Sequence, residues 1–318
     1  MKVGFIGLGN VGGKLAGSLI RNGIDTVVRD LDRDAAQKFI DRGAGWADSP
    51  KQMAEMCDVI ITCLPSPAAC SEVMEGKDGI LDGLSPGKIW MEMSTTDAAE
   101  VKRLGAMVKA KGAEPVDCPV SGGCHRADTG NISIFAGCER ETFEKVLPLT
   151  TVLGRRVLHT GPLGSASTLK VMTNYLATAN LLTCCEALVT MKAAGMDLAT
   201  TYEAMKISSG TSFVHETESQ LILNGSRDVN FTIDLVLKDI GLFQTIAERH
   251  NVPLEISPMI IDIMKDGQQR YGQRANSDDI IRRLEDATGL SILADGFPDD
   301  LVDDEPEEKG YEVVPPGR

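Results

Sequence analysis

Short apolar segments alternate with helix-like segments over the first 163 residues, and this alternation constrains the fold more than any other feature. The apolar segments are rich in the strand formers Val and Ile: KVGFIG, TVVRD, DVIITCLP, KIWMEM, AEPVDCPVSG, SIFAG and VLHTG. Segments with the apolar spacing of helices lie between them: GGKLAGSLIRNG, RDAAQKFIDRG, SPKQMAEMC and TDAAEVKRLGAMVKAKG. Because alternating strands and helices are joined by right-handed crossovers, residues 1–163 are predicted to form a doubly wound, mostly parallel α/β sheet.

After GPLGSAS the pattern changes to helices only. The first of these is expected over residues 165–194, long enough to span roughly 45 Å. Further helices are expected at LATTYEAMKIS, VHETESQLIL, IDLVLKDIGLFQTIAERH, PLEISPMIIDIMKDGQQRY and SDDIIRRLEDATG. Residues 164–296 are therefore predicted to form an all-α second domain, joined to the first by the long helix. The acidic, Pro-containing residues 297–318 read as a tail that is disordered or loosely docked.

The turn after the first strand has the pattern G-x-G-x-x-G, made by Gly7, Leu8, Gly9, Asn10, Val11 and Gly12. Between a strand and a helix, the three glycines permit a tight turn, close approach of the backbone to a pyrophosphate, and close packing of the helix on the strand. The free N–H groups of the helix N-terminus then face the phosphates. The setting predicts a Rossmann domain that binds NAD or NADP. A glycine-rich turn without a ligand is the alternative.

Asp30 ends the second strand, about twenty residues beyond the glycines, where a carboxylate can accept hydrogen bonds from the ribose 2′-hydroxyl of NAD. Arg29 and Arg33 flank it, and an arginine there could instead pair with the 2′-phosphate of NADP. NAD is the preferred prediction because Asp30 would repel a phosphate, while NADP stays possible.

Two later strands end in turns that should also face the cofactor, because ligands of open parallel sheets lie beyond the carboxyl ends of the strands. These turns contain Leu64 and Pro65 in the first case and Thr95 in the second. They are expected to line the nicotinamide side, although such turns also end strands for local reasons.

The loop DCPVSGGCHRADTGN contains Ser121, Gly122 and Gly123. A hydroxyl beside unhindered backbone N–H groups can form a nest for an anion, so this loop is a candidate for binding a substrate carboxylate. An ordinary tight turn is the alternative.

Lys170 and Asn174 lie one helical turn apart on a helix that is otherwise apolar, so their side chains should point at the same volume. A lysine can move a proton near neutral pH when burial or a neighbouring cation lowers its pKa. The helix would supply the burial and Lys238 a second positive charge. The alternatives are a Lys170 that extends to water, an interhelical hydrogen bond for Asn174, and a solvated pair of Lys238 with Asp239.

Four stretches in this order resemble the β-hydroxyacid dehydrogenase family, of the 3-hydroxyisobutyrate dehydrogenase type, over about residues 2–290. They are GFIGLGNVGGKLAGSLIRNG, DCPVSGGCHRADTGNISIFAG, GPLGSASTLKVMTNYL and LVLKDIGL. The resemblance implies an NAD(P)-binding Rossmann domain, an all-helical second domain, and assembly as a homodimer or homotetramer.

By motif position, the resemblance also implies a role for each candidate residue. The glycines would hold the pyrophosphate and Asp30 the ribose. Ser121, Gly122 and Gly123 would bind the substrate carboxylate, and Lys238 would lie at the junction of cofactor and substrate. Lys170 would be the catalytic acid/base and Asn174 its assistant.

The chain departs from the family pattern at three places. Thr173 stands where an asparagine is common, and His125-Arg126 replaces residues that are often small. Arg126 could accept a second anionic group of a substrate, such as a sulfonate or a carboxylate, or could simply face solvent. The acidic tail is also outside the pattern.

Charge and composition exclude other classes of function. The net charge is −14, and an acidic chain without a basic stripe is a poor nucleic-acid binder. Polar residues interrupt the long apolar run, and the N-terminus lacks the features of a signal peptide, so no membrane span is expected. The eight scattered cysteines are expected to be reduced thiols of a cytoplasmic protein, and no spacing suggests a metal site.

The predicted activity is the reversible, NAD(P)-dependent oxidation of a small 3-hydroxy acid to its 3-oxo acid or semialdehyde. The first alternative is another small acid with a second anionic group, such as tartronate semialdehyde or a hydroxy-sulfonate. Oxidative decarboxylation, as in 6-phosphogluconate dehydrogenases, would need a larger helical domain. A non-catalytic dinucleotide-binding protein is the rival from another class.

Overall fold

The chain folds into two units that differ in architecture, as the computed structural model of residues 1–317 shows. The first unit contains residues 1–170 together with residues 303–317, and the second contains residues 171–302. The domain limits predicted from the sequence, at residues 163 and 296, stay a prediction. Packing divides the chain within the long helix, after Lys170, and groups residues 303–317 with the first unit. No helix among residues 1–317 is long and apolar enough to cross a membrane.

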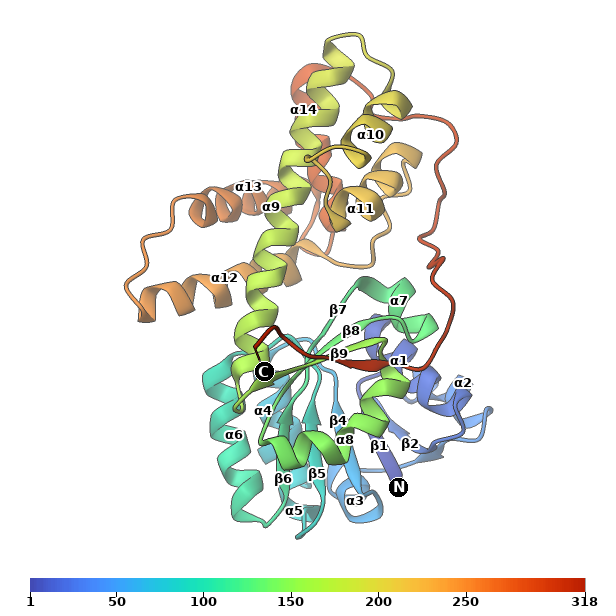
Figure 1. Cartoon of the computed structure of the whole chain (residues 1–318), viewed down its shortest axis with the longest axis vertical. Coiled ribbons are helices and arrows are strands. Elements are labelled where there is room, and N and C mark those ends of the chain that lie inside the picture. The colour runs from blue at the N-terminus through green and yellow to red at the C-terminus, as the bar shows by residue number, and fades with distance from the viewer. Residues whose placement is uncertain (318) are drawn as a thin grey trace. The chain divides into compact units, whose positions relative to one another are not determined.

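The first unit is a Rossmann-type α/β domain built on one ten-stranded sheet (Figure 1). The strands are β1 (Lys2–Ile6), β2 (Asp25–Arg29), β3 (Gly45–Trp46), β4 (Val59–Thr62), β5 (Ile89–Glu92), β6 (Glu114–Asp117), β7 (Val120–Ser121), β8 (Ser133–Gly137), β9 (Arg156–Gly161) and β10 (Tyr311–Val313). The order is β10-β9-β8-β6-β5-β4-β1-β2-β3, with β7 paired to β8. All pairs are parallel except β6–β8 and β7–β8. The order reverses between β1 and β4, which is where such sheets bind their ligands.

Helices cover both faces of this sheet. They are α1 (Asn10–Arg21), α2 (Arg33–Ile40), α3 (Pro50–Met56), α4 (Pro67–Glu75), α5 (Ile80–Gly83), α6 (Ala98–Ala110), α7 (Gly123–Thr129) and α8 (Arg140–Leu153). Local sequence starts several of them: Ser49 and Ser66 cap α3 and α4, and a proline follows each cap. The sequence expectation of a continuous loop after Ser121 is wrong, because residues 123–129 form the helix α7.

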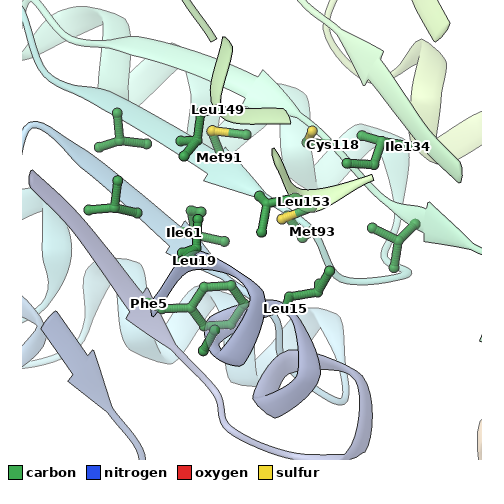
Figure 2. Packing of buried hydrophobic residues seen from close by; sticks show 14 of the residues in the cluster. Phe5, Leu15, Leu19, Ile61, Met91, Met93, Cys118, Ile134, Leu149 and Leu153 are labelled. Atoms are coloured by element: carbon green, nitrogen blue, oxygen red, sulfur yellow. The ribbon is translucent and has the colours of Figure 1, made fainter. Parts of the chain in front are cut away.

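Alternate residues of the strands face two separate cores. Phe5, Ile61 and Met91 pack with side chains of α1 and α8 on one face (Figure 2). Ile60 and Trp90, their neighbours in sequence, pack with α3, α4 and α6 on the other. Because both faces are buried, these strands read as continuous apolar runs.

The second unit is all-helical, as expected. Its elements are the greater part of α9 (Ser165–Ala193), α10 (Leu198–Lys206), α11 (Phe213–Asn224), α12 (Ile233–Arg249), α13 (Ile256–Tyr271), the 3₁₀ helix η1 (Ser277–Ile281) and α14 (Arg282–Thr288). Its core includes Leu188, Tyr202, Ile222, Val236 and Met264. The long helix predicted over residues 165–194 is confirmed.

The C-terminal tail differs from the expectation. Residues 311–313 form β10, which pairs in parallel with β9 of the first unit. Carboxylates of the preceding residues form ion pairs with arginines of that unit. The prediction of a disordered or loosely docked tail is therefore wrong for residues 303–313, because local composition does not reveal these distant partners.

Candidate functional site

The predicted glycine turn, from Gly7 through Leu8, Asn10 and Val11 to Gly12, connects β1 to α1. Gly7 has φ +99°, and a Cβ there would lie 2.2 Å from the Cys63 carbonyl oxygen. A Cβ on Gly12 would lie 2.1 Å from the Gly7 carbonyl oxygen. Both positions therefore admit only glycine.

Gly9 differs, because a Cβ there would meet nothing within 4 Å. The space beside this residue, at the N-terminus of a 12-residue helix, fits a diphosphate that approaches the backbone closely. The residues present thus fit a dinucleotide.

Asp30 is half-buried and is oriented by two backbone groups. Its carboxylate accepts hydrogen bonds from the N–H of Leu8 (2.6 Å) and from the N–H of Asp32 (3.1 Å). The carboxylate predicted to contact a ribose is therefore hydrogen-bonded directly to the backbone of the glycine turn.

The two arginines near Asp30 both contact Trp46. The guanidinium of Arg29 lies 5.8 Å from the centre of the ring and donates to the Ala47 carbonyl (3.0 Å). The guanidinium of Arg33 lies 5.4 Å from the same ring. Trp46 thus binds, by cation–π contact, the two arginines that flank Asp30 in the sequence.

A buried carboxyl group that the sequence reasoning missed ties the next two loops together. The Leu64 N–H donates to the Ser94 hydroxyl (2.7 Å), and the Ser94 N–H donates to Glu92 (2.7 Å). Glu92 also accepts from Thr62 (2.8 Å) and from the thiol of Cys70. Burial raises the pKa of Glu92 although these donors lower it. These hydrogen bonds fix the loop that contains Leu64 and Pro65 against the loop that contains Thr95.

The predicted carboxylate-binding residues lie where β7 ends and α7 begins. Ser121 is the last residue of β7, and Gly122 and Gly123 follow with φ +132° and +85°. A Cβ on Gly122 would lie 3.3 Å from Cδ of Arg126. Positive φ at both glycines is a conformation that larger residues rarely adopt, and a turn of this kind is where successive backbone N–H groups can form an anion nest.

Lys170 lies in the second turn of α9 and is only 8% exposed. Its Nζ is 3.4 Å from the Ser121 hydroxyl oxygen. The side chain is therefore not extended to water, and the first unit brings together the predicted acid/base and the predicted carboxylate loop.

Asp117, which the sequence reasoning also missed, fixes the start of α9. This buried carboxylate at the end of β6 accepts from the N–H (2.8 Å) and the hydroxyl (2.6 Å) of Ser167. Burial raises its pKa to about 6, although the Ser167 hydrogen bonds lower it. Its only signal in the sequence is a charged residue at the end of an apolar strand. Because Ser167 lies one turn before Lys170, Asp117 positions the lysine.

Asn174 follows Lys170 by one helical turn and belongs to the second unit. Its amide donates to Asp239 of α12 (2.5 Å), so the interhelical hydrogen bond considered above is present. Lys238 forms an ion pair with the same Asp239 (3.0 Å), whose side chain is 2% exposed, so the pair is not a solvated one. The sequence analysis named Asp239 only as the partner of Lys238 in a solvated pair. Its burial and its contact with Asn174 were not predicted, because an acid beside a lysine suggests a surface charge pair.

The cysteines and two of the histidines lie in structural surroundings. All eight cysteines are free thiols, and six of them are buried. His215 is buried, and its Nε2 is hydrogen-bonded to the Tyr202 carbonyl (2.9 Å). The Nε2 of His159 is hydrogen-bonded to the Cys138 carbonyl (2.9 Å). Within residues 1–317, no group of three or more His, Cys, Asp or Glu side chains could hold a metal ion.

Comparison with known proteins gives the same assignment for both parts of the chain. Residues 2–161 match the NAD-binding domain of 6-phosphogluconate dehydrogenase. Residues 164–284 match the family described as NAD-binding of NADP-dependent 3-hydroxyisobutyrate dehydrogenase. Residues 285–318 lie outside both matches.

Individual proteins match over most of their length. The chain is 30% identical to 2-(hydroxymethyl)glutarate dehydrogenase of Eubacterium barkeri, over 92% of this chain and 97% of that one. It is 32% identical to the mitochondrial 3-hydroxyisobutyrate dehydrogenase of Rattus norvegicus, over 79% and 77% respectively. The crystal structure of a 3-hydroxyisobutyrate dehydrogenase from Salmonella typhimurium superimposes with a TM-score of 0.81 at 26% identity, over 89% of this chain and 99% of that one. The chain therefore belongs to the NAD(P)-dependent β-hydroxyacid dehydrogenases of the 3-hydroxyisobutyrate dehydrogenase-like type.

Proposed function

We propose that the protein reversibly oxidises a small 3-hydroxy acid, similar to 3-hydroxyisobutyrate, to its 3-oxo acid or semialdehyde, with Lys170 as general acid/base. The observation that carries this proposal is the position of the buried Lys170 amine, 3.4 Å from the Ser121 hydroxyl. One amine thus lies beside a loop suited to a carboxylate, and a 3-hydroxy acid carries both groups that this pair can bind.

In the proposed reaction, Ser121 and the backbone N–H groups of Gly122 and Gly123 hold the substrate carboxylate. The neutral amine of Lys170 takes the proton of the substrate hydroxyl during oxidation. During reduction the ammonium form returns a proton to the carbonyl oxygen. The bound nicotinamide supplies the chemistry of hydride transfer to or from the carbinol carbon. Positioned proton transfer of this kind contributes about 10²–10⁴-fold in rate.

Asn174 and Lys238 have supporting roles in this proposal. Asn174 holds the substrate hydroxyl or orients the amine, and its hydrogen bond to Asp239 fixes the rotamer of its side chain. Lys238 contributes positive charge at the junction of cofactor and substrate, although its ion pair with Asp239 offsets part of that charge.

The proposed cofactor is NAD, with NADP as the alternative. The orientation of the Asp30 carboxylate by the glycine turn supports NAD, because a 2′-phosphate would meet a negative charge there. The arginines held against Trp46 support NADP. Comparing kcat/KM for the two dinucleotides tests the choice.

The second candidate substrate is an acid with a further anionic group. Its support is the similarity to a dehydrogenase named for 2-(hydroxymethyl)glutarate, which is a dicarboxylate, and the presence of Arg126 near the carboxylate loop. Arg126 is, however, 3.2 Å from a carboxylate oxygen of Glu305, so a second anionic group would have to compete with this partner.

The decisive experiment is an absorbance assay of reduced nicotinamide with a panel of 3-hydroxy acids, run with NAD and NADP side by side. Turnover of singly charged 3-hydroxy acids, lost in Lys170→Ala with dinucleotide binding retained, is the expected result. Turnover of no member of the panel with either dinucleotide would favour a non-catalytic role, and release of CO₂ would favour oxidative decarboxylation. Light scattering would test the proposed homodimer or homotetramer.

A further inference from the structure

The C-terminal segment, defined here as residues 303–313, is an integral part of the first unit. The Gly310 N–H donates to the Thr151 carbonyl (3.0 Å), and the Tyr311 N–H donates to the Arg155 carbonyl (2.9 Å). A Cβ on Gly310 would lie 2.0 Å from the Gly154 carbonyl oxygen, so the segment packs directly against the backbone.

Asp303 begins the C-terminal segment and accepts hydrogen bonds from polar groups at the end of α7 and just after it. Its side chain is 2% exposed. Its carboxylate accepts from the Asn131 amide (2.7 Å) and from the Thr129 hydroxyl. Burial raises the pKa of Asp303, but the hydrogen bonds from Thr129 and Asn131 and the charge of Arg126 outweigh burial and hold it below its ordinary value. Asp303 is therefore an anion in the folded protein.

Two carboxylates of the C-terminal segment converge on Arg126 of α7. An oxygen of Glu305 lies 3.2 Å from its Nη2, and an oxygen of Asp303 lies 3.9 Å from its Nε. The aliphatic part of Arg126 lies against Gly122, since a Cβ on this glycine would be 3.3 Å from Cδ. The same Glu305 carboxylate also lies 3.2 Å from Arg156. A guanidinium directly beside the proposed carboxylate loop is thus bound by anions of the protein itself.

Three other carboxylates of the C-terminal segment pair with different arginines, and the first of them is Glu307, which pairs with Arg21 (3.0 Å). Glu308 forms an ion pair with Arg155. Glu312 forms an ion pair with Arg140, whose Nη2 lies 3.1 Å from a carboxylate oxygen of Glu312. These pairs attach the segment to α1, to α8 and to the residue that precedes β9. Among the carboxylates of residues 303–313, those that form ion pairs with Arg126 are Asp303 and Glu305.

We propose that Asp303 and Glu305 make the site selective for acids with a single negative charge, by neutralising Arg126 beside the carboxylate loop. This inference rests on the proposed function of that loop. A substrate with a second anionic group would have to displace Glu305 from the guanidinium and would meet the charge of Asp303. Both effects disfavour the doubly charged acid and leave the singly charged one unaffected, which is discrimination by repulsion.

The test uses the full chain with substitutions that keep side-chain volume. Glu305→Gln removes one carboxylate from Arg126, and Asp303→Asn with Glu305→Gln removes both. The matched control is Glu308→Gln with Glu312→Gln, which deletes the same number of charges from the same segment. For each protein, kcat/KM is measured with 3-hydroxyisobutyrate and with 2-(hydroxymethyl)glutarate.

The expected result is a rise in the preference for the doubly charged acid. The ratio of the two kcat/KM values should increase about tenfold in the double variant at Asp303 and Glu305 and about threefold in Glu305→Gln, as for partly buried charge pairs. The gain should appear in KM for 2-(hydroxymethyl)glutarate, with kcat for 3-hydroxyisobutyrate unchanged. Adding Arg126→Gln should abolish it, and the control variant should keep the wild-type ratio.

An unchanged ratio in a folded Glu305→Gln protein, or an equal rise in the control variant, would overturn the inference. Calorimetric dissociation constants for the same two acids provide the same comparison without turnover. If the wild-type protein turns over no member of the panel with either dinucleotide, the proposed function fails, while a selective gain in the affinity of the Asp303 and Glu305 variants for the dicarboxylate would still support the inference.

Discussion

Asp117→Asn probes the buried carboxylate that holds the start of α9. The folded protein raises the pKa of Asp117 from 3.8 to about 6, chiefly through burial. An acid with a raised pKa binds its proton more tightly in the folded state, so its contribution to stability is complete below pH 3.8 and is lost as the pH rises through about 6. This shift corresponds to a loss of about 3 kcal/mol, since one pKa unit is about 1.4 kcal/mol. The pKa of about 6 is the net result of burial, which raises it, and of the hydrogen bonds from Ser167, which lower it.

Asparagine has nearly the same volume and does not ionise, so the difference between the two proteins isolates this titration. Between pH 4 and pH 8, the wild-type protein should lose about 2 to 3 kcal/mol of unfolding free energy relative to Asp117→Asn. Urea unfolding followed by tryptophan fluorescence is the assay, because the chain has two tryptophans, Trp46 and Trp90, and both lie in the first unit.

Ser167→Ala is the matched comparison for this experiment. Without the hydroxyl that donates to Asp117 at 2.6 Å, the pKa should rise further, so the total loss of stability should be larger and should extend to higher pH. A difference between wild type and Asp117→Asn that does not change with pH would refute the reasoning. A difference of opposite slope would mean that the hydrogen bonds outweigh burial.

Three further predictions concern the dinucleotide and the amine. Lys170→Ala should lower kcat by about 10²–10⁴-fold while calorimetry detects unchanged dinucleotide binding, and near-normal turnover would contradict the assigned role. Gly12→Ala places a Cβ 2.1 Å from the Gly7 carbonyl oxygen, so it should lower both the Tm and the affinity for the dinucleotide. Gly9→Ala places a Cβ that meets nothing within 4 Å, so it should lower the affinity alone. Equal changes in Tm for the two variants would contradict this reasoning. Asp30→Ala should reduce the kcat/KM preference for NAD over NADP roughly tenfold, and an unchanged ratio would exclude its contact with the ribose.

Most of the fold follows from local pattern in the sequence. Strands buried on both faces read as apolar runs, and the long α9 has a sufficient run of helix-forming residues, so both were predicted. The helix α8 was not predicted, and it contains Pro148, a residue that normally ends a helix. The helix α4 was also not predicted, although Ser66 followed by Pro67 is a recognisable start signal.

Candidate positions could be named from the sequence where a residue type stands out in its setting, and their roles stay predictions. Glycines at positive φ and a lysine in an apolar helix are visible as departures from the local pattern. The burial of Glu92, Asp117 and Asp239 was not predicted, because a carboxylate in sequence looks the same whether it is solvated or buried among donors from other elements. Partners such as Cys70 for Glu92 and Ser167 for Asp117 lie far along the chain, where no local pattern reveals them.

The pairing of β10 with β9 has a consequence for solubility. A strand at the border of a sheet presents unpaired N–H and C=O groups to which another molecule can add. The backbone of Tyr311–Val313 covers those groups of β9, and the charged Glu312 and the small number of residues in β10 make the new border a poor template for further addition. A chain that ends before Tyr311 would uncover β9, and its tendency to associate strand to strand would increase.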